Sequence, residues 1–91
     1  MQRRIHFFVS GNVSGVFFRS FIKEHADVFS LKGFTRNTAD GKVEAIVEGE
    51  TRAINKLIDL CKKGPKFAKV SDVKIVEETF KDEFKDFAIL R

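Results

Sequence analysis

Apolar side chains stand at every second position over residues 4–9, which predicts a strand with one buried face. That face carries Ile5, Phe7 and Val9, and the opposite face carries His6 and Phe8. From residue 18 the period becomes that of an amphipathic helix, with one stripe of apolar and aromatic side chains. The stripe contains Phe18, Phe21, Ile22, His25, Ala26 and Phe29.

Two short strands, over residues 34–37 and 42–48, flank a turn that contains Asp40-Gly41, a good hairpin signal. We expect Gly49 to end the second of these strands and Thr51 to cap a second helix. The apolar stripe of that helix contains Ala53, Ile54, Leu57, Ile58 and Cys61.

The second helix should end after the basic pair Lys62-Lys63, at Gly64-Pro65. A fourth strand is predicted around residues 70–76 and a short final strand over residues 84–90. This order predicts an α+β, ferredoxin-like βαββαβ sandwich. Both helices should cover one face of a mostly antiparallel sheet of four to five strands, leaving the other face relatively open. The architecture alone assigns no function.

The composition favours a single domain over residues 1–91, with 43% apolar and 33% charged residues. All eleven aromatic residues are Phe, which we expect mainly to fill the core. The net charge of +4 would attract anions without selecting among them. Cys61 is the single cysteine and is expected to be a buried structural thiol. The sequence contains no signal peptide and no membrane span, and a single cysteine cannot form an internal disulfide. These features indicate a cytoplasmic protein.

The segment between the first strand and the first helix is the most informative part of the chain. Two glycines and a serine allow a turn whose backbone N–H groups point into one concavity beside a helix N-terminus, and Arg19 would add a planar fork of donors. The candidate phosphate-binding residues are Ser14, Gly15, Val16, Phe17, Phe18 and Arg19. On spacing alone, an ordinary glycine-rich turn with a solvated arginine explains the segment as well.

Two motifs in the correct order resemble the acylphosphatase family. The segment Val9-Ser10-Gly11-Asn12-Val13-Ser14-Gly15-Val16-Phe17-Phe18-Arg19 is similar to its first signature, roughly V-x-G-x-V-Q-G-V-x-F-R. The second signature, roughly G-[WF]-V-x-N-x-x-D-G-x-V, resembles Gly33-Phe34-Thr35-Arg36-Asn37-Thr38-Ala39-Asp40-Gly41-Lys42-Val43. The chain departs from these patterns at Ser14, where the family has Gln, and at Thr35, where it has an apolar residue. Ser14 brings side-chain support of the loop, and hence the rate, into question.

The resemblance implies that Arg19 binds the phosphoryl group and that Asn37 positions the attacking water. The implied reaction is hydrolysis of the carboxyl–phosphate bond of an acyl phosphate, with no cofactor and no metal. The sequence agrees, because His6 and His25 are not at ligand spacing and the acidic residues are expected on exposed faces.

The expected partners are a small acyl phosphate and the competing anions inorganic phosphate and sulfate. We expect a monomer that binds neither nucleic acid nor a membrane. Two alternatives remain: an RNA-binding RRM-like module, which shares the order of elements, and a weakly active acylphosphatase-like domain. Lys32-Gly33-Phe34 resembles the start of an RNA-binding motif, but Thr35-Arg36-Asn37 does not continue it.

Overall fold

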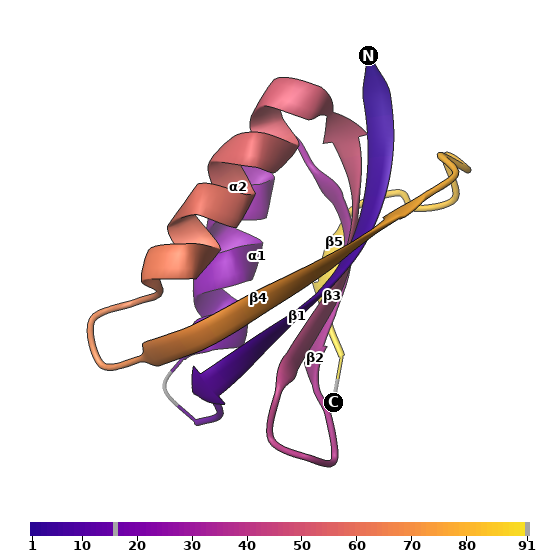
Figure 1. Cartoon of the computed structure of the whole chain (residues 1–91). Helices are drawn as coiled ribbons and strands as arrows, with labels where there is room; N and C mark the ends of the chain where they lie inside the picture. Colours follow the sequence, from indigo (N-terminus) through magenta and orange to yellow (C-terminus); the bar gives the residue numbers. More distant parts are fainter. Residues whose placement is uncertain (16, 91) are drawn as a thin grey trace.

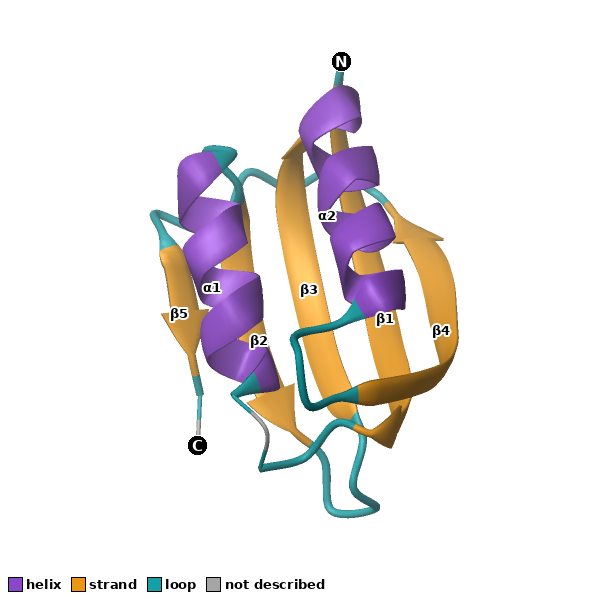
Figure 2. Cartoon of the chain, turned by 90° about the vertical axis from the view of Figure 1, so that its left-hand side faces the viewer, coloured by secondary structure: helices purple, strands orange, loops and turns teal. Residues whose placement is uncertain are grey.

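Two helices pack on one face of a five-stranded sheet (Figures 1 and 2). The structure, a computed structural model, describes residues 1–15 and 17–90. Its elements are β1 (Gln2–Asn12), α1 (Phe18–Val28), β2 (Lys32–Asn37), β3 (Val43–Glu50), α2 (Thr51–Lys63), β4 (Lys69–Glu78) and β5 (Phe87–Ile89). The strand order is β4-β1-β3-β2-β5, and every neighbouring pair is antiparallel except β2 and β5, which are parallel. The predicted ferredoxin-like class is confirmed.

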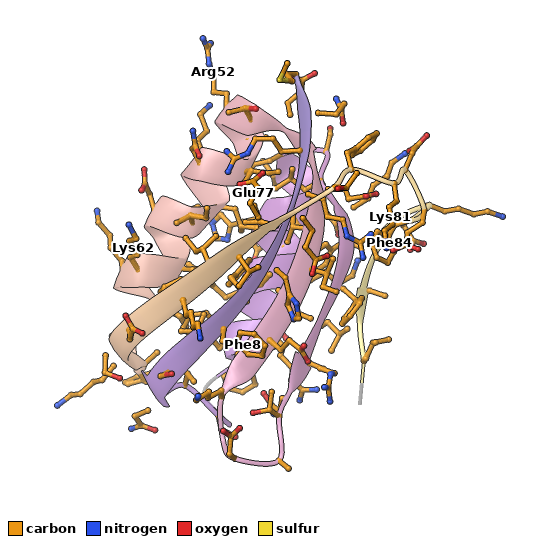
Figure 3. All side chains as sticks on the ribbon, turned by 45° about the vertical axis from the view of Figure 1, so that its right-hand side comes forward. Phe8, Arg52, Lys62, Glu77, Lys81 and Phe84 are labelled. Carbon is orange, nitrogen blue, oxygen red and sulfur yellow. The ribbon has the colours of Figure 1, made fainter. Side chains whose placement is uncertain are left out.

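The core lies between the helices and the sheet, where the alternation of β1 and β3 directs apolar side chains. The fully buried apolar residues of β1 and β3 are Ile5, Phe7, Val9, Val43, Ala45 and Val47, and the helices contribute Phe18, Ile22, Ala26, Ile54, Leu57 and Cys61. Burial raises the pKa of the Cys61 thiol to about 12, so this cysteine is a packing residue with no nucleophilic character at neutral pH. On the outer side of α2, Arg52 and Lys62 point away from the core (Figure 3).

Several element boundaries differ from the prediction, and β1, β2 and β4 are each longer than predicted. β3 continues through Gly49 to Glu50, because residues 2–4 of β1 extend the pairing to that point. The predicted Thr51 cap is wrong: Glu50 is the N-cap, without a side-chain bond, and the Thr51 hydroxyl donates instead to the carbonyl of Met1 at 3.0 Å. The last strand is shorter than predicted, covering Phe87–Ile89.

The expectation that all acidic residues lie on exposed faces is wrong for Glu44 and Glu48, which are buried. The sheet face opposite the helices, which was predicted to be relatively open, is partly covered by residues 79–86, which lead from β4 to β5. Phe84 packs there edge-on against Phe34, with ring centroids 6.0 Å apart, and the Arg4 guanidinium lies over the Phe84 ring. This cover explains the burial of Glu48, while the Glu44 carboxylate lies between His6 and Arg36.

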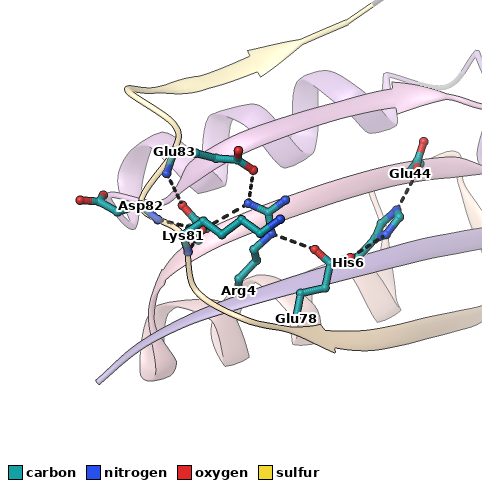
Figure 4. Close-up of polar contacts among 8 residues, drawn as sticks. Arg4, His6, Glu44, Glu78, Lys81, Asp82 and Glu83 are labelled. Atoms are coloured by element: carbon teal, nitrogen blue, oxygen red, sulfur yellow. Dashed lines mark hydrogen bonds and ion pairs between the residues drawn. The ribbon is translucent and has the colours of Figure 1, made fainter.

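An ionic network ties the covering segment to the sheet (Figure 4). The Glu48 carboxylate accepts backbone N–H groups of Lys81, Asp82 and Glu83 at 2.8–3.2 Å and pairs with Arg4. The other ion-pair partners of Arg4 are Glu78 and Glu83. The buried guanidinium and the buried carboxylate thus provide each other with charge and hydrogen-bond partners, which both groups need because burial removes them from water.

His6 extends the same network along the sheet, because its imidazole lies 2.6 Å from a Glu44 oxygen and 3.3 Å from a Glu78 oxygen. The Arg36 Nε atom lies 2.6 Å from the other Glu44 oxygen, an ion pair without hydrogen-bond geometry.

Among the helices that the structure describes, none is long and apolar enough to cross a bilayer.

Candidate active site

The loop between β1 and α1 turns sharply into the helix. Val13 is buried and anchors the start of the loop, and Phe18, the first helical residue, is buried at its end. Between them, Gly15 has a φ of 73° and Phe17 a φ of 61°, both in the left-handed region. Phe17 is the N-cap of α1, and its side chain remains 81% exposed. A left-handed residue followed by a helical one is a backbone arrangement that can form an anion-binding concavity.

Arg19 lies in the first turn of α1 and is half-buried. Its Nη1 atom donates to the carbonyl of Leu90 at 3.1 Å. The Leu90 N–H in turn donates to the carbonyl of Thr35 in β2 at 2.8 Å. The segment after β5 is thus held by the sheet and orients the guanidinium, which has five N–H donors in total.

Asn37 is the last residue of β2 and is half-buried. Side chains alternate along a strand, so Asn37 faces the same side as the buried Gly33 and Thr35, the side that the helices cover. Beyond it, the turn to β3 is closed by a hydrogen bond of 2.8 Å from Thr38 N to Lys42 O.

A pocket of about 290 Å³ lies between the loop, α1, β2 and β5. It is lined by both Arg19 and Asn37, and by Gly15, Phe17 and Phe18 from the predicted phosphate-binding segment. Ser14 is exposed and does not line the pocket, and Val16 lies outside the described residues. The structure therefore brings most of the candidate residues together.

Among the residues near the pocket that the sequence-based prediction did not include, two come from the end of the chain. Ile89 lines it, and Leu90 binds Arg19 through its carbonyl. The apolar run at the end of the chain did predict a strand, but its parallel pairing with β2 carries no local sequence signal. That pairing places Ile89 opposite Thr35, close to Asn37.

The surroundings of the pocket carry little charge. Arg19 is the only charged residue among the described residues that line it. Residues 1–15 and 17–90 contain no group of three or more His, Cys, Asp and Glu side chains placed to hold a metal ion. A larger hollow of about 950 Å³ lies around Met1 and the start of α2, and none of the candidate residues lines it.

The departure at Thr35 has a structural explanation. Its side chain is fully buried, and its hydroxyl donates to the carbonyl of Glu44 in β3 at 2.9 Å. A buried hydroxyl with a partner is tolerated in a core. Thr35 therefore joins two strands and does not line the pocket.

Comparison with known proteins gives the family. The family model of acylphosphatase matches residues 5–89. The chain belongs to the acylphosphatase family. An acylphosphatase of Syntrophus aciditrophicus is 44% identical over 90 residues, which cover 99% of this chain and 94% of that protein.

Solved structures agree with this assignment. The crystal structure of acylphosphatase from Bacillus subtilis superposes with a TM-score of 0.94 at 33% identity and covers 100% of both chains. A crystal structure of full-length HypF, in a phosphate- and nucleotide-bound form, matches with a TM-score of 0.88 at 26% identity, but the chain corresponds to only 12% of it. The acylphosphatases of these two organisms match over nearly their whole length, so this chain is an enzyme of that family, and a small-molecule acyl phosphate is the substrate class.

Proposed function

We propose that Arg19, together with backbone N–H groups of residues 14–19, holds the phosphoryl group of an acyl phosphate, and that Asn37 orients the water that attacks phosphorus. The observation that carries this proposal is the shared pocket: Arg19 of α1 and Asn37 of β2 line one hollow beside the loop. The residue matches to the family signatures support the same roles.

The chemistry needs little beyond positioning. In phosphoryl transfer, charge is spread over the equatorial oxygens, and the attacking and leaving oxygens lie in line. A guanidinium and a set of backbone donors stabilise that charge, and the fork of Arg19 fits two phosphate oxygens. The amide of Asn37 offers an acceptor and donors, so it can orient a water without removing its proton. Because a carboxylate is a good leaving group, the reaction proceeds without a metal ion or a strong acid.

A phosphate-release assay tests this function. Acetyl phosphate and p-nitrophenyl phosphate are compared at equal concentrations, with and without excess chelator. We expect release from acetyl phosphate in both conditions and release from the ester at least about a hundred times slower. Inorganic phosphate and sulfate should inhibit competitively.

Loss of activity in the presence of chelator would refute the metal-free mechanism. Equal cleavage of the ester would refute the role of the carboxylate leaving group. Retention of RNA without hydrolysis of acetyl phosphate would favour an RNA-binding module instead.

A further inference from the structure

The pocket has an apolar side that the phosphoryl group does not need. Its volume of about 290 Å³ is near the lower end of small-molecule sites, roughly 300 Å³, so it has room for a ligand larger than a phosphoryl group. Besides Arg19 and Asn37, it is lined by Phe17 and Ile89, whose side chains are 81% and 37% exposed.

Phe17 has two unfavourable features in the same place. A left-handed φ of 61° is uncommon for a residue with a Cβ atom, and a large aromatic ring is left in water. Exposed apolar residues are ordinary elsewhere, as for Phe67 at 73% exposure, but Phe67 does not line this pocket. The left-handed backbone and exposed ring of Phe17, in the pocket that Arg19 and Asn37 line, point to a role in binding.

We propose that Phe17 and Ile89 form an acyl-binding wall, which selects acyl phosphates whose acyl group is uncharged and apolar. This inference rests on the proposed function. In-line attack places the leaving carboxylate on the far side of phosphorus from the water, and Phe17 and Ile89 are the exposed apolar residues that line the same pocket among the described residues. There, the two side chains would lose their contact with water when an apolar acyl group binds. An acyl group with a second negative charge would lose hydration against the same wall, and this loss of hydration free energy would weaken its binding.

The experiment compares three substrates: benzoyl phosphate, acetyl phosphate and succinyl phosphate, whose acyl group ends in a carboxylate. The variants are Phe17→Ala and Ile89→Thr, with Phe67→Ala as the matched control. The readout is the ratio of kcat/KM for benzoyl phosphate to that for acetyl phosphate. Because any damage to the phosphate end affects both substrates alike, it cancels in this ratio.

We expect the unmodified protein to prefer benzoyl over acetyl phosphate and to use succinyl phosphate least. The benzoyl-to-acetyl ratio should fall about tenfold in Phe17→Ala, the lower end of the range for apolar contacts in a pocket, should fall by a smaller factor in Ile89→Thr, and should not change in Phe67→Ala. An unchanged ratio in both pocket variants, or a preference for succinyl phosphate, would overturn the acyl-binding wall while leaving the proposed function standing. Inactivity of the unmodified protein on all three substrates would overturn the proposed function itself.

Discussion

At the scale of single residues, the proposed chemistry is divided between two side chains that come from different elements. Arg19 has a positive charge that can bind a phosphate, and its guanidinium is oriented by the carbonyl of Leu90. Asn37 is neutral and stands at the end of β2. Substitution of the two residues should therefore affect different kinetic constants.

Asn37→Ala should lower kcat on benzoyl phosphate by about 10²–10³, because a preorganised group that acts in the transition state is lost. The competitive inhibition constant of inorganic phosphate should change by less than about threefold, since phosphate is held elsewhere. Steady-state kinetics with phosphate as inhibitor measure both constants. Asn55→Ala on α2, outside this pocket, is the control. A folded Asn37→Ala protein with ordinary turnover would refute the role.

Arg19→Lys should raise the inhibition constant of inorganic phosphate at least about tenfold and lower kcat/KM by about a hundredfold. A lysine ammonium is a point charge and cannot bind two phosphate oxygens as a planar fork does. The matched control is Arg52→Lys, on the outer side of α2 (Figure 3). Similar phosphate inhibition in the two variants would contradict the assignment.

At the scale of elements, β2 depends on a very close approach to β3 at Gly33. A Cβ atom at this position would lie 1.9 Å from the carbonyl oxygen of Ile46, and φ is 143°. Because the obstacle is backbone, it cannot move without separating the two strands. This explains in physical terms why the second signature begins with glycine, four residues before Asn37 in the same strand.

Gly33→Ala should therefore lower the free energy of unfolding by about 4 kcal/mol or more, a loss typical of severe steric conflict. Gly41→Ala is a matched control, because Gly41 has a φ of 85° but nothing within 4 Å of its Cβ position. There we expect a loss of about 1–2 kcal/mol, from the left-handed backbone alone. Urea denaturation followed by circular dichroism measures both losses. Equal losses would show that the close approach to Ile46 adds nothing to the loss of stability in Gly33→Ala.

At the scale of the whole molecule, the ionic network on the sheet face is connected to the candidate active site through the chain itself. Glu48 holds residues 81–83, Gly33 N donates to Asp86 O at 2.9 Å, and β5 then continues to Leu90 beside Arg19. The Lys23 ammonium also donates to the carbonyl of Phe87 at 2.9 Å. The position of the guanidinium thus depends on contacts from both faces of the sheet.

Acid should weaken this network. Burial alone would raise the pKa of Glu48, but the backbone N–H groups of residues 81–83 and the Arg4 side chain hold it below its ordinary value of 4.5. The hydrogen bond from Arg4 likewise lowers the pKa of Glu78. A carboxylate with a lowered pKa in the folded state contributes stability above its unfolded pKa, and that contribution is lost as the pH falls through the folded value.

We therefore expect the free energy of unfolding to decrease as the pH falls from about 5 towards 3. Glu48→Gln should lower it by about 3 kcal/mol at pH 7, because Arg4 is left buried with one fewer charge partner, and should flatten its decrease in acid. Urea titrations at a series of pH values test this. Glu77→Gln, in the exposed pair with Arg3, is the control and should have a much smaller effect. An unchanged acid profile in Glu48→Gln would contradict the role of this carboxylate.

Much of the fold follows from local patterns. The alternation at Ile5, Phe7 and Val9, the stripe of the first helix and the turn at Asp40-Gly41 all predicted elements that the structure contains. Such patterns are reliable because the local backbone geometry of a strand or a helix fixes the spacing at which side chains return to the same face. The prediction of a Thr51 cap is wrong because the Thr51 hydroxyl donates to the carbonyl of Met1, the residue before β1.

By itself, the sequence determined the order and type of the elements and, through two motifs, which residues to expect in the site. Only the tertiary structure decided that β5 pairs in parallel with β2, that Ile89 joins the pocket with Arg19 and Asn37, and that Glu48 is buried. The reason is the distance along the chain: these contacts join segments that share no local period, so they form only when the whole sheet is assembled.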